Sequence, residues 1–201
     1  MTPIQTRYRG YNFRSRLEAR WAVFFDHLGV KWDYEVEGFD IDGTFYLPDF
    51  RLTSDKHDSV VWVEIKPSGG ASSEKFQQFA KSTSDLAFMF EGTPWDWFKV
   101  DTLIDERRIV PPRLCPRCGM PTYEHWHPMN NDDFFAICHP CDWATASIND
   151  EERGLLCDVQ SHKGSIDFSS NNATAAMSKI VKACIAARSA RFEHGECGAT
   201  L

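Results

Sequence analysis

Long apolar segments are missing from this 201-residue chain. No run of about 18 apolar residues occurs, so no segment is expected to span a membrane. The first residues, MTPIQTRYRGYNF, lack the apolar core of a signal peptide. We therefore expect a cytoplasmic protein. Internal repeats and low-complexity segments are also missing, so the interpretation rests on individual motifs and their spacing.

An excess of positive charge is missing as well. The chain has 22 Lys and Arg against 29 Asp and Glu, for a net charge of −7. This balance argues against a protein that coats nucleic acid through its overall charge. The basic residues are nevertheless grouped. The first two groups are as consistent with a solvated surface as with a binding face, and the third favours a solvated surface. The groups are Arg7, Arg9, Arg14, Arg16 and Arg20; Arg107, Arg108, Arg113 and Arg117; and Lys179, Lys182, Arg188 and Arg191.

The first half of the chain has the pattern of a mixed α/β domain. Ser15 and Glu18 fit the S-x-x-E capping box, apolar residues follow at helical spacing, and Gly29 is expected to end the helix. Asp42-Gly43 is a hairpin signal. The predicted elements are a hairpin over 6–13, a helix over 15–28, strands over 31–37, 44–52 and 60–66, a helix over 73–83, and a strand over 86–90. This order predicts a mixed sheet flanked by helices.

Two carboxylates and a lysine are spaced so that they can meet on that sheet. Asp49 follows Pro48 near the end of one predicted strand. Fourteen residues separate it from Glu64, and Lys66 lies two positions after Glu64 on the next predicted strand. Residues two apart on a strand face the same side. Two close carboxylates repel each other, and a divalent cation such as Mg²⁺ removes that penalty. With Lys66 beside them, the set supplies the charges needed for phosphodiester hydrolysis.

The segments SRLEARWA, LPDF and VEIK, with Pro48-Asp49 and Glu64-Ile65-Lys66, resemble the PD-(D/E)xK nuclease superfamily over residues 6 to 100. Similar members include phage and bacterial nuclease-like proteins, transposon-end endonucleases and very-short-patch repair endonucleases. The resemblance implies a restriction-endonuclease-like fold: a helix, a three-stranded antiparallel meander, a helix and a strand. It implies that Asp49, Glu64 and the Ile65 carbonyl bind Mg²⁺ or Mn²⁺, and that Lys66 orients or activates water. Glu18 would be an accessory catalytic residue, although the capping box alone also explains it.

One feature of many exonucleases in that superfamily is missing. They carry a Gln-x-x-x-Tyr pair on the second helix, whereas Gln77 and Gln78 are followed at that spacing by Lys81 and Ser82. This difference weakens the case for an end-dependent exonuclease and leaves nicking or structure-selective cutting open. Near the first helix, Arg14, Arg16 and Arg20 are candidates for contacts with DNA phosphates.

Four of the seven cysteines form two CxxC pairs, Cys115 with Cys118 and Cys138 with Cys141, nineteen residues apart. Without a secretory signal, this pattern favours a closed structural Zn²⁺ site over disulfides. A redox role explains a single pair but not two. We therefore predict three regions: a nuclease-like domain over 1–110, a zinc ribbon over 111–148, and a polar tail over 149–201 that contains an amphipathic helix from Ala173 to Phe192.

The sequence therefore predicts a metal-dependent DNA endonuclease, a Mg²⁺-dependent phosphodiester hydrolase from a bacterial cell or a phage-infected host. The alternative is a catalytically silent protein of the same fold that binds DNA or acts as an adaptor, with its zinc ribbon docking a protein partner. RNA remains open as a substrate. A double-strand break would need a dimer, and no segment of the sequence identifies an interface for one.

Overall fold

The computed structural model describes the chain in ten segments. They are residues 5–55, 57–69, 73–94, 113–114, 120–125, 134–138, 143–147, 157–162, 165–168 and 182–192. In the described part of the chain, no helix is both long and apolar enough to cross a membrane.

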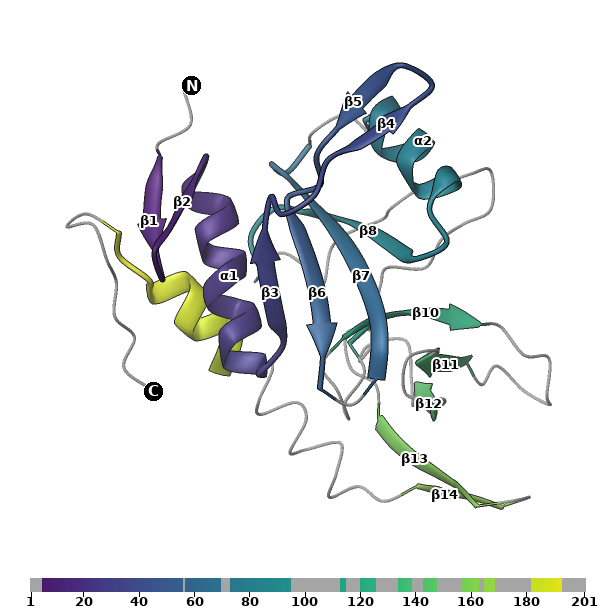
Figure 1. The fold of residues 1–201 in the computed structure, drawn as a ribbon. Coiled ribbons are helices and arrows are strands. Elements are labelled where there is room, and N and C mark those ends of the chain that lie inside the picture. Colours follow the sequence, from purple (N-terminus) through teal and green to yellow (C-terminus); the bar gives the residue numbers. More distant parts are fainter. Residues whose placement is uncertain are drawn as a thin grey trace.

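A four-stranded mixed sheet lies at the centre of the N-terminal half (Figure 1). Its order is β3-β6-β7-β8, with antiparallel pairs except for the parallel pair β7 and β8. Two hairpins and two helices accompany it. The bounds are β1 Thr6–Tyr8, β2 Tyr11–Phe13, α1 Arg16–Leu28, β3 Lys31–Tyr34, β4 Phe39–Ile41, β5 Thr44–Tyr46, β6 Phe50–Ser54, β7 His57–Lys66, α2 Glu74–Ser82 and β8 Leu86–Glu91. The prediction of a mixed α/β domain is confirmed at this level.

The first helix, α1, begins and ends as its sequence predicts. Ser15 is the N-cap, and its hydroxyl oxygen accepts a hydrogen bond of 3.2 Å from the Glu18 N–H. Gly29 is the C-cap, with a left-handed φ of 68°, and its N–H donates to the Asp26 carbonyl. The helix buries Trp21, Phe24 and Phe25, and because all residues from 21 to 25 are buried, more than one side of it is covered. These caps fix where α1 starts beside the sheet.

Replacing Gly29 with alanine tests the C-cap. A Cβ atom disfavours positive φ, so Gly29→Ala is expected to lower the free energy of unfolding by about 1 kcal/mol. Gly29→Asn is the matched control, because asparagine tolerates the left-handed region better and should lose less. Urea unfolding followed by circular dichroism measures both variants. Equal stability of Gly29→Ala and the wild type would contradict the assignment.

Strand β7 separates two hydrophobic cores because its side chains alternate between the faces of the sheet. Val61, Val63 and Ile65 belong to the core that α1 covers. Trp62 belongs to the core formed with α2 and the β4–β5 hairpin, where Phe76 is fully buried. Glu64 and Lys66 continue the Trp62 side of the alternation, at the end of the strand.

The predicted strand over 44–52 is wrong as a single element. The structure forms β5 and β6 instead, and they belong to different sheets with residues 47–49 in no strand. Pro48 has no N–H to donate to a ladder, which accounts for a break at this point. Asp49 therefore precedes β6, at the point where that strand enters the central sheet.

A C-terminal helix over residues 182–189 packs into the same core as α1. Ala183, Cys184 and Ala187 are buried there, and the Cys184 thiol donates to the Pro94 carbonyl across 3.5 Å. The helix agrees with the predicted one, of which residues 173–181 lie outside the described part of the chain. Helical spacing groups Ile185 with Cys184 on the apolar side of the predicted helix, but this expectation is wrong for Ile185, whose side chain is 53% exposed. The contact face consists of small residues, which allow close backbone approach, and Ile185 lies beside it.

A second, antiparallel sheet follows, with the strand order β14-β13-β12-β11-β10-β9. Its bounds are β9 Arg113–Leu114, β10 Pro121–His125, β11 Phe134–Cys138, β12 Trp143–Ser147, β13 Cys157–His162 and β14 Ser165–Phe168. The polar sequence over 149–172 predicts no element, yet β13 pairs with β12 at Thr145↔Asp158. A backbone ladder satisfies N–H and C=O groups whatever the hydropathy of the side chains, which explains the difference. Of the predicted zinc ligands, Cys138 ends β11, and Cys115, Cys118 and Cys141 lie outside the described residues.

Candidate active site

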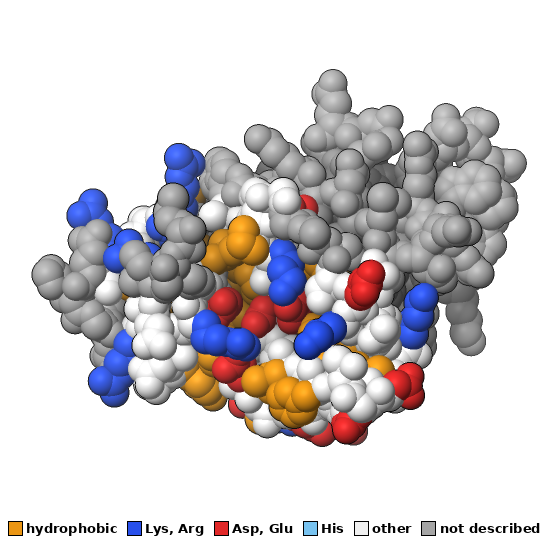
Figure 2. Space-filling view, turned by 90° about the horizontal axis from the view of Figure 1, so that it is seen from above, with side chains coloured by type: hydrophobic (Ala, Val, Ile, Leu, Met, Phe, Trp, Pro, Cys, Tyr) orange, Lys and Arg blue, Asp and Glu red, His pale blue; other side chains and the backbone are white. Residues whose placement is uncertain are grey.

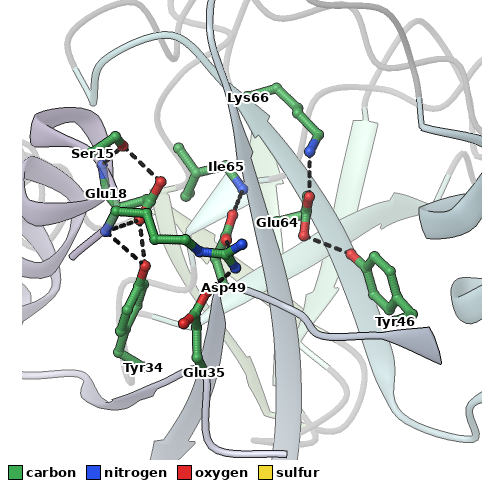
Figure 3. Close-up of polar contacts among 10 residues, drawn as sticks. Ser15, Glu18, Tyr34, Glu35, Tyr46, Asp49, Glu64, Ile65 and Lys66 are labelled. Atoms are coloured by element: carbon green, nitrogen blue, oxygen red, sulfur yellow. Dashed lines mark hydrogen bonds and ion pairs between the residues drawn. The ribbon is translucent and has the colours of Figure 1, made fainter. Parts of the chain in front are cut away.

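Asp49 and Glu64 meet at one end of the central sheet. In the register of β6 and β7, Phe50 lies opposite Val63, so the residue before β6 and the residue after Val63 become neighbours. Figure 3 shows both carboxylates at this end, with Lys66 and Tyr46 beside Glu64. Figure 2 shows acidic side chains gathered near the middle of one face, with Lys and Arg side chains next to them. The two predicted carboxylates therefore converge.

A backbone N–H group and a cationic side chain hold the Asp49 carboxylate in place. Its side chain accepts a hydrogen bond of 2.7 Å from the Ile65 N–H, and the residue is only 7% exposed. The Arg14 Nη2 atom lies 4.0 Å from the other carboxylate oxygen. The Asp49 carbonyl accepts from the Glu35 N–H at 3.0 Å. These contacts fix the carboxylate at the boundary between β6 and β7.

Glu64 has a different set of partners. The residue is 6% exposed, and its Oε2 atom accepts a hydrogen bond of 2.6 Å from the Tyr46 hydroxyl. Its Oε1 atom forms an ion pair with the Lys66 ammonium. The Lys66 side chain is 28% exposed, so the ammonium lies between the buried carboxylate and solvent. This is a position from which a cation can contact an anionic substrate.

Glu18 joins the other side of the site from α1. Its Oε1 atom accepts 2.7 Å from the Ser15 hydroxyl, and its Oε2 atom accepts 2.5 Å from the Tyr34 hydroxyl. The Arg14 N–H donates to the same Oε2 atom at 3.1 Å. Glu18 also raises the pKa of Asp49 through its charge. The side chain therefore both caps the helix and contributes to the electrostatics of the carboxylate pair.

The carboxylate pair is electrostatically strained. Burial is the largest cause that raises the pKa of Asp49, to about 8, and repulsion by Glu64 adds to it. The Ile65 N–H and Lys66 act in the opposite direction. Burial and Glu64 also raise the pKa of the Tyr46 hydroxyl, which therefore stays a hydrogen-bond donor. Protonation of Asp49 and a bound cation would each relieve this repulsion.

No match helps to interpret this geometry. Protein-family models, curated proteins and solved structures were searched, and none of them matches the chain. The site has to be interpreted from its own chemistry.

The donor set fits a hard divalent cation. Two buried carboxylates that repel each other supply the oxygen ligands that Mg²⁺ prefers. Within the described residues, no three His, Cys, Asp or Glu side chains form a ready-made metal group. Mg²⁺ is commonly bound through one or two carboxylates and several waters, so Asp49 and Glu64 are a sufficient protein contribution.

The predicted site residues divide into two groups in space. Asp49, Glu64, Ile65 and Lys66 come together, with Glu18 and Arg14 beside them. Arg16 and Arg20 instead line a separate pocket with residues of the C-terminal helix.

Sequence reasoning missed Tyr46 and Tyr34, whose hydroxyls hold Glu64 and Glu18. An available signal was the aromatic alternation in each strand, which turns a hydroxyl-bearing ring toward a core. The alternation does not identify the carboxylate that each tyrosine contacts, because that contact forms through tertiary packing.

The pKa of Asp49 predicts how the stability of the metal-free protein depends on pH. The folded pKa of about 8 exceeds the ordinary value of 3.8, so the folded state holds a proton that the unfolded state releases. The stabilisation is complete below pH 3.8 and is lost as pH rises through about 8. In EDTA, raising the pH from 5 to 8.5 should lower the stability by at least about 1 kcal/mol, or about 2–4 °C in Tm.

Asp49→Asn is the control for this pH dependence. An asparagine cannot ionise, so the variant should lose most of the decline in Tm between these pH values. Differential scanning fluorimetry of both proteins in the same buffers measures the effect. An identical decline in the variant would assign the pH dependence to another group.

Proposed function

We propose that this chain is a metal-dependent deoxyribonuclease that hydrolyses phosphodiester bonds within DNA. One observation carries the proposal: two buried carboxylates and a lysine converge at the end of the central sheet, where Lys66 reaches solvent. The charges are those that hydrolysis of a phosphodiester requires, since the reaction develops negative charge on phosphate oxygens.

The order of elements also supports a restriction-endonuclease-like fold. After α1, the strands β3, β6 and β7 pair antiparallel, and α2 then leads to β8, which pairs parallel with β7. This is the order of helix, antiparallel meander, helix and strand that the PD-(D/E)xK resemblance implies. The β4–β5 hairpin is an addition between β3 and β6, and it brings Tyr46 to Glu64.

In the proposed reaction, a water oxygen attacks phosphorus and gives up a proton to solvent. The bond to the leaving oxygen breaks, and the leaving oxygen gains a proton from solvent. Asp49 and Glu64, with the Ile65 carbonyl, would hold Mg²⁺ or Mn²⁺. When bound, the metal supplies Lewis-acid stabilisation of the phosphate and lowers the pKa of water. Tyr46 orients Glu64 through its hydroxyl. Lys66 offsets charge on the phosphate and positions the attacking water.

Arg14 has a supporting role in this proposal. Its guanidinium lies between Asp49 and Glu35, and more than half of its side chain is exposed. A cation in this place offsets the negative charge of Asp49, as Lys66 offsets that of Glu64. That placement suits a contact with a phosphate next to the one that is cleaved. The zinc ribbon and its four cysteines remain a prediction, as does a protein partner docking there.

Cleavage of a labelled panel tests the function. Linear duplex, supercoiled plasmid, single strand, flap and four-way junction would each be incubated with Mg²⁺, Mn²⁺, Ca²⁺ or EDTA. Cleavage in Mg²⁺ or Mn²⁺ that co-elutes with the protein on gel filtration is expected, with none in EDTA. A mock purification without the protein controls for host nucleases. A folded protein that binds these substrates without cutting any would contradict the proposal and favour an adaptor role.

A further inference from the structure

A second pocket lies between α1 and the C-terminal helix. Its volume is about 480 Å³. Four arginines from two distant parts of the chain contribute to its walls. The lining residues are Arg16, Arg20, Arg188, Ser189, Ala190, Arg191 and Phe192. Helix α1 and the C-terminal helix belong to one hydrophobic core, so both sides of the pocket are fixed to the same scaffold.

The pocket is strongly cationic. Its lining, as far as the structure describes it, contains four guanidinium groups and no carboxylate. The Arg20 Nε atom is buried and has no hydrogen-bond partner among the described residues. A buried donor on a charged group that lacks an acceptor is unfavourable, so the positive charge of Arg20 adds to the preference of this pocket for an anion.

Phosphate is the anion that this lining fits best. Guanidinium groups present paired N–H donors that match phosphate oxygens, and several of them around one cavity favour an anion of high charge density. The volume exceeds what a single carboxylate would fill and lies in the range of ligand pockets that hold molecules of nucleotide size. Phe192 adds a buried aromatic ring to the wall.

Helix α1 directs its pocket-lining arginines and its site glutamate to different sides, which separates this pocket from the carboxylates. Arg16 and Arg20 are four residues apart and share one face of the helix. Glu18 lies between them in sequence and therefore projects about 200° away from Arg16 around the helix axis. A phosphate in the pocket is thus a different phosphate from one at Asp49 and Glu64.

We propose that the pocket formed by Arg16, Arg20, Arg188 and Arg191 binds a phosphate group of a nucleic-acid strand. The phosphate follows from the lining residues, and the strand as its carrier rests on the proposed function. The C-terminal helix thereby contributes directly to substrate binding, and the phosphate bridges it to α1.

Binding in EDTA tests the pocket without any cleavage. Fluorescence anisotropy would follow a 3′-fluorescein single-stranded DNA with either a 5′-phosphate or a 5′-hydroxyl, and inorganic phosphate would serve as a competitor. Arg16→Gln and Arg188→Gln change exposed residues and should fold. Each is expected to weaken binding about tenfold or more, the size of one lost hydrogen bond to a charged group. Arg7→Gln is the matched control, because Arg7 is an exposed arginine outside the lining.

The probes identify the source of the phosphate. A loss confined to the 5′-phosphorylated strand assigns a terminal phosphate, and an equal loss with both strands assigns the backbone. Displacement of either strand by millimolar inorganic phosphate, weakened in Arg188→Gln, supports the same chemistry. Affinities of Arg16→Gln and Arg188→Gln equal to that of Arg7→Gln would overturn the proposal. Because no metal is present, that outcome is independent of whether the carboxylates support cleavage.

Discussion

Replacing Glu64 with glutamine is expected to lower the rate of metal-dependent cleavage by at least about 10³-fold. Glutamine keeps the shape of the side chain and can still accept from the Tyr46 hydroxyl. It loses the negative charge that makes the pair with Asp49 a ligand for a divalent cation. Isothermal titration with Mn²⁺ should show weaker binding in the variant, and the labelled DNA panel measures the rate.

Glu74→Gln is the matched control for this substitution. Glu74 is an exposed glutamate in the first turn of α2, and it is not a hydrogen-bond or ion-pair partner of Asp49 or Glu64 in the contacts described above. Its replacement should leave both Mn²⁺ binding and cleavage close to the wild-type values. A Glu64→Gln variant that folds, binds Mn²⁺ normally and still cleaves DNA would remove Glu64 from the proposed site.

Replacing Lys66 with methionine should separate metal binding from catalysis. The methionine keeps much of the aliphatic volume and removes the ammonium that pairs with Glu64. Cleavage is expected to fall by about 10²–10³-fold, the size of one lost electrostatic contact to the reacting phosphate. Mn²⁺ affinity should hold or rise, because a competing cation beside Glu64 is gone.

Lys81→Met removes the same charge from an exposed position in the last turn of α2, and its cleavage rate should stay near that of the wild type. The informative comparison is the ratio of rate to Mn²⁺ affinity in the two variants. If Lys66→Met lost metal binding and cleavage in parallel, the lysine would have a structural role. Unchanged cleavage in Lys66→Met would exclude it from the reaction.

Much of the N-terminal half could be predicted from local patterns. Ser15 and Gly29 mark both ends of α1, and Asp42-Gly43 marks the β4–β5 hairpin, because caps and turns depend on nearby residues. The separation of β5 from β6 was missed. It depends on Pro48 and on which sheet each strand joins, which is a tertiary choice that strand propensity does not contain.

The candidate site shows the same division. Asp49, Glu64 and Lys66 could be found from spacing, because strand periodicity places the latter two on one face. Tyr46 reaches Glu64 from a hairpin that belongs to another sheet, so no spacing within the sequence predicts that contact. The four-arginine pocket likewise joins α1 to residues about 170 positions later, and the grouping of Arg16 with Arg188 depends on helix packing.

The packing of the C-terminal helix into the core that α1 covers has a consequence for biosynthesis. Cys184 meets the carbonyl of Pro94, and Phe192 packs against Tyr8 with ring centroids 6.4 Å apart. A nascent chain therefore carries α1 and the central sheet long before the ribosome has made the residues that cover this part of the core. Emergence of residue 192 closes the core and completes the four-arginine pocket, so an unfinished chain would have its carboxylates in place before this pocket has formed.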